Sequence, residues 1–175
     1  MKVLNLILVS LLMIMASAIA VASQDVKVGE TAPSFSLQNQ KNEKFSLESR
    51  KGHWTVLYFY PKAETPGCTK QACAFRDNIE KIRKLGAEVY GISVNSVEDQ
   101  SKFSANHHLN FDLLADEKAQ VTELYGSKMP ILKMSKRWTF LIDGDLKIRS
   151  IDKDVDPVKD ADHVAEAIGK LMQQK

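Results

Sequence analysis

Two cysteines, Cys68 and Cys73, are the side chains most able to do chemistry in this 175-residue chain, and it has no others. A thiolate is a nucleophile that can be oxidised reversibly. Just before Cys68, Thr65 can occupy the N-cap of a helix, Pro66 its first position, and Gly67 permits close backbone approach. Cys68 then lies in the first helical turn, where unpaired N–H groups and the helix dipole favour a thiolate. This segment is the predicted site.

The five-residue spacing of the cysteines leaves several interpretations open. In an ideal helix such residues lie about 8–9 Å apart, whereas a disulfide needs Cα atoms within about 7 Å. A bond would therefore require the first turns to unwind, which fits redox catalysis. A structural disulfide is the alternative, although a loop this short constrains little of the unfolded chain. The spacing also differs from the Cys-x-x-Cys of disulfide exchange enzymes.

A metal site is a weaker alternative for the same segment. Zinc needs about four ligands, and the obvious additions to the cysteines are His107 and His108. Adjacent histidines at the end of a helix are more typical of a solvated pair. We therefore expect neither a metal nor a cofactor.

The elements around the cysteines can be read from apolar patterns. Residues 53–60 are almost all β-branched or aromatic, as in a strand buried on both faces. The helix that follows should end near Leu85, before Gly86. Its apolar stripe has 4-3-4-3 spacing and comprises Cys68, Ala72, Phe75, Ile79 and Ile82. Cys73 falls on another face.

The rest of the chain alternates between strand and helix patterns. Strands are expected at 34–37, 43–47 and 87–93, helices at 96–107 and 118–125, and a short apolar segment at 111–114. A hairpin is predicted at 138–151 around Asp143-Gly144, before a last helix with one apolar face: Ala161, Val164, Ala165, Ile168, Leu171 and Met172. This order predicts an α/β thioredoxin-like fold, a central mixed β-sheet flanked by helices.

The start of the chain has the composition of a targeting signal. Lys2 precedes an apolar run to about Ala22, which predicts a cleaved signal peptide at 1–22, one domain at 23–175, and a periplasmic or secreted protein. An uncleaved membrane anchor is the alternative. Without the leader the chain has 23 basic and 22 acidic residues. Such an interspersed, nearly neutral composition predicts no nucleic-acid partner.

The cysteine segment resembles a known family. Pro61-x-x-x-Thr65-x-x-Cys68 matches the active-site motif of the peroxiredoxins, and Thr69-Lys-Gln-Ala-Cys73 resembles the bacterioferritin comigratory protein, or PrxQ, branch. The likeness extends from Gly29 to Asp143. The chain differs from many relatives at Ser93-Val-Asn-Ser, at 128–136 and at Trp138, which bears on the pocket.

The resemblance implies a role for each of five residues. Cys68 would be the peroxidatic cysteine and Cys73 the resolving one, forming an intramolecular disulfide. Pro61 would shield the pocket, the Thr65 hydroxyl would hydrogen-bond the reacting oxygens, and Arg137 would favour the thiolate and orient the peroxide. Backbone N–H groups near Cys68 would stabilise developing negative charge.

The implied function is a thiol-dependent peroxidase in antioxidant defence. Its substrates would be hydrogen peroxide and organic hydroperoxides, and its reductant a thioredoxin-like or other dithiol donor. The chain has no cysteine-bearing C-terminal extension, so we expect a monomer. Two alternatives are an exported thiol–disulfide oxidoreductase and a non-enzymatic thioredoxin-fold protein with a structural disulfide.

Overall fold

A mixed seven-stranded sheet organises the computed structural model, which describes residues 26–173. The strand order is β2-β1-β5-β4-β3-β6-β7. The strands are β1 (Ser36–Asn39), β2 (Lys44–Ser46), β3 (Trp54–Phe59), β4 (Ala87–Ser93), β5 (Asp112–Ala115), β6 (Trp138–Ile142) and β7 (Ile148–Asp152). Neighbours β3, β4 and β5 run parallel, and the remaining pairs are antiparallel. The predicted thioredoxin-like α/β sheet, with its late hairpin, is confirmed.

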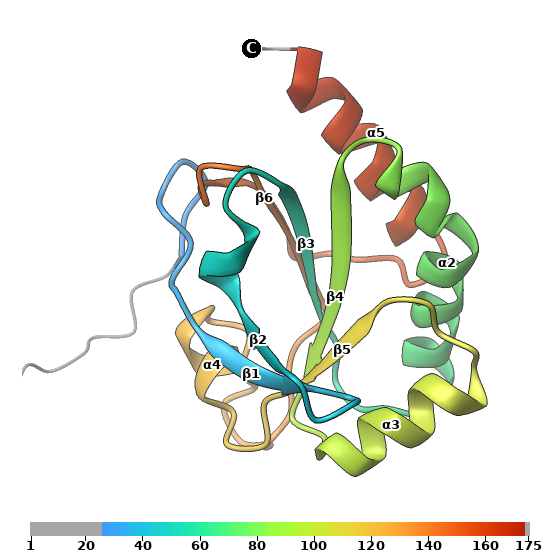
Figure 1. Cartoon of the computed structure of the whole chain (residues 1–175). Helices are drawn as coiled ribbons and strands as arrows, with labels where there is room; N and C mark the ends of the chain where they lie inside the picture. The colour runs from blue at the N-terminus through green and yellow to red at the C-terminus, as the bar shows by residue number, and fades with distance from the viewer. Residues whose placement is uncertain (1–25, 174–175) are drawn as a thin grey trace, which may run out of the picture.

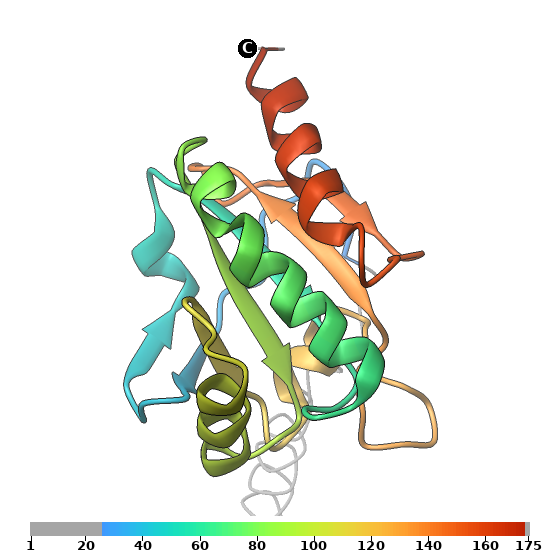
Figure 2. The same ribbon diagram turned by 90° about the vertical axis from the view of Figure 1, so that its right-hand side faces the viewer.

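Helices cover both faces of this sheet. They are α2 (Pro66–Arg83), α3 (Val97–Asn106), α4 (Gln120–Leu124) and α5 (Asp160–Gln173), with a 3₁₀ turn η1 at Leu47–Arg50. In Figure 1, α2, α3 and α5 lie on one side of the strands and α4 on the other. Figure 2 shows α2 and α5 side by side across the sheet. None of the helices within residues 26–173 is long and apolar enough to cross a bilayer.

Strand β3 lies inside the sheet, between β4 and β6, and is buried throughout. Its alternating side chains divide the apolar interior into two cores. Val56 and Tyr58 join the core under α2 and α5, whereas Leu57 and Phe59 join the core on the opposite face. The almost unbroken apolar run in the sequence is therefore explained by helices or loops on both sides.

Helix α2 follows β3 and carries both cysteines. The predicted stripe is confirmed, because all five of its residues are buried: Cys68, Ala72, Phe75, Ile79 and Ile82. Gly86 adopts a positive φ of 71° just beyond the helix, as its expected role at the C-terminus requires. Packing of this stripe against β3 and β4 fixes the position of Cys68.

Ser96 caps α3, and its Oγ accepts a hydrogen bond from the Asp99 N–H at 3.1 Å. One local prediction needs refinement. In α5 the predicted apolar face is buried at Ala161, Val164, Ala165 and Ile168, but Met172 is 44% exposed. The last turn of α5 extends past the edge of the core, so Met172 has nothing to pack against.

Candidate active site

Cys68 lies at the third position of α2, directly after the carboxyl end of β3 and its connecting loop. The side chain is 1% exposed and belongs to the core beneath α2. Thr65 precedes the helix in an extended conformation, and the first repeating backbone hydrogen bond joins the Thr69 N–H to Thr65 O at 2.9 Å. The N–H groups before Thr69 therefore have no helical acceptor, and they belong to the same turn as Cys68.

Arg137 is the charged group next to this sulfur. Its Nη2 lies 3.5 Å from Cys68 Sγ, and its Nη1 donates a hydrogen bond to Gln71 Oε1. A Cβ added at Gly67 would lie 3.2 Å from the same Nη2, so the glycine allows the guanidinium to pass close to the helix. A cation in this position stabilises a thiolate.

A buried polar chain continues from Arg137 away from the sulfur. Gln71 Nε2 donates to Asp160 Oδ2 at 2.6 Å, and Thr139 Oγ1 donates to the same oxygen at 2.9 Å. Burial raises the pKa of Asp160 to about 6, although the hydrogen bonds from Gln71 and Thr139 act in the opposite direction. This hydrogen-bonded chain thus joins residues of α2, α5 and β6 with Arg137, which directly precedes β6.

Sequence reasoning missed Gln71 and Asp160. The position of Gln71 could have indicated its role, because it lies three residues after Cys68 and therefore on the buried side of α2. A fully buried glutamine needs hydrogen-bond partners. Nothing comparable marks Asp160, which is 89 residues away in the sequence.

Thr65 and Pro61 lie in the loop between β3 and α2. Thr65 is at the N-cap position, but its side chain makes no capping hydrogen bond and instead donates to Lys62 O at 2.9 Å. Its hydroxyl is therefore not committed to the helix. Pro61 follows the buried end of β3 and is itself half-buried.

Contacts from neighbouring elements hold this loop in place. The Ala63 N–H donates to Asn95 Oδ1 at 3.0 Å. Glu64 has a positive φ of 63°, and its carboxylate is bound by Asn106 Nδ2 and His107 Nε2, each at 2.9 Å. Hydrogen bonds from His107 and Asn106 lower the pKa of Glu64. The end of α3 thereby fixes the loop that precedes Cys68.

Cys73 is on the same helix but apart from the network around Cys68. Both thiols are free, and Cys73 is half-buried. Since both residues are inside α2, the ideal-helix separation of about 8–9 Å applies and prevents a disulfide in this conformation. The structure therefore brings Cys68 and Arg137 together and leaves Cys73 outside their contact.

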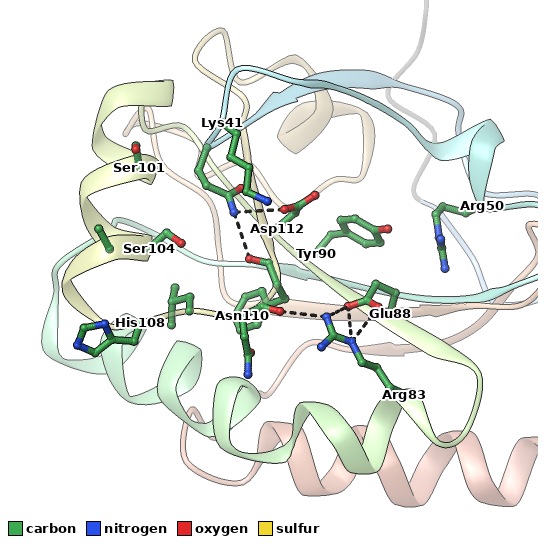
Figure 3. Close-up of a pocket in the computed structure, with 14 residues that line it drawn as sticks. Lys41, Arg50, Arg83, Glu88, Tyr90, Ser101, Ser104, His108, Asn110 and Asp112 are labelled. Carbon is green, nitrogen blue, oxygen red and sulfur yellow. Dashed lines mark hydrogen bonds and ion pairs between the residues drawn. The ribbon is translucent and has the colours of Figure 1, made fainter.

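A hollow lies elsewhere on the molecule. It measures about 720 Å³ and is bordered by α3, β4 and β5 (Figure 3). Two of its charged side chains form an ion pair, Arg83 with Glu88 at 2.8 Å, and Asp112 accepts a hydrogen bond from the neutral Gln40 at 3.2 Å. No predicted site residue lines it. Among the described residues there is also no cluster of three or more His, Cys, Asp or Glu suited to a metal.

Comparisons with known proteins identify the family to which this chain is similar. A family model described as AhpC/TSA family matches residues 28–151. Peroxiredoxin Bcp of Escherichia coli is 44% identical over 135 residues, covering 74% of this chain and 86% of that protein. Putative peroxiredoxin bcp of Coxiella burnetii is 40% identical over 152 residues, covering 83% and 99%.

Solved structures give the same result. The peroxidoxin BcpB of Mycobacterium tuberculosis superposes with a TM-score of 0.78 at 32% identity, covering 83% of this chain and 98% of that one. The bacterioferritin comigratory protein of Xanthomonas campestris, described in terms of its alkyl peroxide reduction activity, gives 0.75 at 26% identity, covering 78% and 91%.

One expectation from the sequence is wrong. The predicted periplasmic or secreted location is contradicted because Bcp relatives are typically cytoplasmic. The comparisons also give no support to an export signal. The leader predicted at 1–22, and the membrane anchor considered as its alternative, lie outside the described residues.

Proposed function

This chain belongs to the AhpC/TSA family and, within it, to the Bcp/PrxQ peroxiredoxins, which are thiol peroxidases; on that basis we propose that Cys68 is its peroxidatic cysteine. The observation that carries the proposal is the contact between Arg137 Nη2 and the buried Cys68 Sγ at 3.5 Å. A cation and the first turn of a helix both act on this sulfur.

The oxidative step uses the groups around Cys68. The thiolate attacks one oxygen of a hydroperoxide, a sulfur–oxygen bond forms, and the O–O bond breaks. Cys68 becomes a sulfenic acid, and the leaving oxygen takes a proton to give water or an alcohol. Arg137 and the N–H groups before Thr69 stabilise the charge that moves onto oxygen. The Thr65 hydroxyl, which donates to Lys62 O in the structure, instead donates a hydrogen bond to the peroxide. Pro61 limits the access of water to Cys68.

Cys73 acts next, as the resolving cysteine. Its thiolate attacks the Cys68 sulfenic sulfur, the sulfur–oxygen bond breaks, and an intramolecular disulfide forms while the leaving hydroxide takes a proton from solvent to become water. Because both residues are in α2, the first turns of that helix unwind before the sulfurs meet. Unwinding also separates Gln71 from Arg137 and Asp160, so the polar chain exists only in the peroxide-reactive conformation. A thioredoxin-like or other dithiol donor then returns both cysteines to thiols.

The substrates we propose are hydrogen peroxide and organic hydroperoxides. The alkyl peroxide reduction activity named for the Xanthomonas campestris relative supports the second class. We also propose that the protein is a monomer, because Cys73 supplies the resolving thiol within one chain. Light scattering of the reduced full chain tests this, and a stable dimer would contradict it.

Cys73→Ser tests the proposed resolution step. The variant should consume one equivalent of hydrogen peroxide per chain, because Cys68 is intact, and then retain a sulfenic acid that a dimedone probe labels. Turnover with dithiothreitol or a thioredoxin should fall by about tenfold or more, since no intramolecular disulfide is presented to the donor. Ser49→Ala, which removes the hydrogen bond from Ser49 Oγ to Ser46 O in η1, is the control for general destabilisation. Unchanged turnover and no dimedone label in Cys73→Ser would exclude Cys73 as the resolving residue.

A further inference from the structure

Asp160 is the one carboxylate in the buried chain that leads to Cys68. It is the first residue of α5, is 1% exposed, and has no hydrogen bond to the sulfur. Its Oδ2 accepts hydrogen bonds from Gln71 Nε2 and from Thr139 Oγ1. Gln71 then presents its Oε1 to Arg137 Nη1.

The chemistry of these partners gives the chain a direction. An ionised carboxylate only accepts hydrogen bonds, so the Gln71 amide must turn its NH₂ group toward Asp160. The amide oxygen is then the end that faces Arg137, whose guanidinium only donates. If the amide were reversed, its NH₂ group would meet the guanidinium, and both groups would be donors. Arg137 and the ionised Asp160 therefore favour the same orientation of Gln71, and the carboxylate fixes the amide from the side away from the sulfur.

We propose that Asp160 is a positioning residue for the peroxide reaction: its carboxylate fixes the Gln71 amide so that the carbonyl oxygen holds the Arg137 guanidinium against Cys68. The inference rests on the proposed role of Cys68 and adds a regulating group to that site. It acts through two intermediate side chains and over three separate elements of the fold.

The same arrangement makes the site sensitive to pH. Burial raises the pKa of Asp160 to about 6, so the group is mostly protonated at pH 5 and ionised at pH 8. A protonated carboxyl group has both a donor and an acceptor, as an asparagine amide does, so it no longer fixes the Gln71 amide from its side and Arg137 is the one group of this chain that still orients it. The restraint on Arg137 is thus present above pH 6 and is lost as the pH falls through 6.

Other titratable groups face Asp160, and their effects on the pH dependence must be distinguished from its own. Tyr58 on β3 and Asp152 on β7 interact with it electrostatically, and so does His163 on its own helix. Asp152 raises the pKa of Asp160 and His163 lowers it. Because histidines generally titrate between pH 5 and 8, a His163→Gln variant belongs in the test.

The test uses the full chain with Cys73→Ser, so that Cys68 is the only thiol. The rate of Cys68 alkylation by iodoacetamide and the single-turnover rate with hydrogen peroxide are measured from pH 5 to pH 8. Asp160→Asn is compared with its parent at each pH. Asp162→Asn is the matched control, because it makes the same change two residues along α5 at an exposed side chain paired with Lys81.

In the Asp160→Asn variant, both rates should equal those of the parent at pH 5 and fall about tenfold below them at pH 8. The rates of Asp162→Asn should equal those of the parent at every pH. In His163→Gln the rates should still change near pH 6, as they do in the parent. A ratio for Asp160→Asn that is constant across pH would overturn the proposal, because it would indicate a general structural defect.

An exchange of partners provides a second test. In Gln71→Glu with Asp160→Asn, the asparagine NH₂ group donates and the glutamate accepts, so an oxygen again faces Arg137. This double variant should recover most of the rate lost in Asp160→Asn at pH 8; no recovery would count against the proposal. Alkylation keeps the two hypotheses apart. If the parent is alkylated normally but fails to consume peroxide, the proposed function fails, while the pH-dependent ratio still decides the role of Asp160.

Discussion

Replacing Cys68 with serine should abolish peroxide turnover, with a loss of roughly 10³-fold or more. The substitution is nearly isosteric at a buried position, so the fold around α2 should be retained. A serine hydroxyl remains protonated near neutral pH and does not attack the O–O bond. The measurement is hydrogen peroxide consumption by the full chain with excess dithiothreitol, with circular dichroism confirming that the variant folds.

Two outcomes would contradict this prediction in different ways. If Cys68→Ser keeps turning over while Cys73→Ser does not, the peroxidatic role belongs to Cys73. If the wild-type chain consumes neither hydrogen peroxide nor an alkyl hydroperoxide, although both thiols are confirmed as reduced, the assignment of this site is wrong. The non-enzymatic thioredoxin-fold interpretation would then regain weight.

Much of the architecture could be predicted because its signals are local. The stripe that includes Cys68 and Phe75 sets the buried face of α2, and Gly86 marks its end. The alternation of strands and helices then leaves few possible sheets. Local patterns were less informative where an element runs past the core, as at Met172, since exposure there depends on how far the neighbouring elements extend.

The polar interior of the site shows where sequence reasoning stops. Gln71 and Asp160 meet only because α2 and α5 pack side by side on the same face of the sheet (Figure 2). No spacing rule relates two residues 89 positions apart. A buried glutamine beside the reactive cysteine indicates that a partner exists, but only the tertiary structure identifies it.

Arg137 illustrates the same limit from the other direction. In the sequence it follows Lys136, and the two could equally form a solvated basic run. In the structure the neighbours separate: Lys136 Nζ lies 4.7 Å from the centre of the Trp138 ring, while Arg137 reaches Cys68. The start of β6 thus directs one cation to the site and the other to an aromatic face, a distinction that the composition of the segment does not contain.

Arg137→Met should reduce the single-turnover rate with hydrogen peroxide by about 10²-fold, comparable to the loss of one donor to a developing oxyanion. The methionine keeps the apolar stem but removes both the contact with Cys68 Sγ and the donor to Gln71. The single-turnover rate of Arg137→Lys should be about tenfold below that of the wild type, and thus between the rates of the wild type and Arg137→Met. A single ammonium group lacks the fork that reaches the sulfur and the amide together.

Lys136→Met is the matched control for Arg137→Met, because it removes an adjacent positive charge that lies over Trp138 instead of Cys68. Its rate should stay within about twofold of the wild type, since the Lys136 ammonium contacts the Trp138 ring and Gly126 O and has no contact with Cys68.

Equal losses in Lys136→Met and Arg137→Met would mean that the general field of this basic segment, and not the contact at 3.5 Å, activates the thiol. A full rate in Arg137→Lys would show that a point charge suffices. The hydrogen bond between Arg137 and Gln71 would then be unnecessary for the reaction, and Asp160 could not influence the rate by orienting Gln71. This variant therefore also tests the role proposed for Asp160.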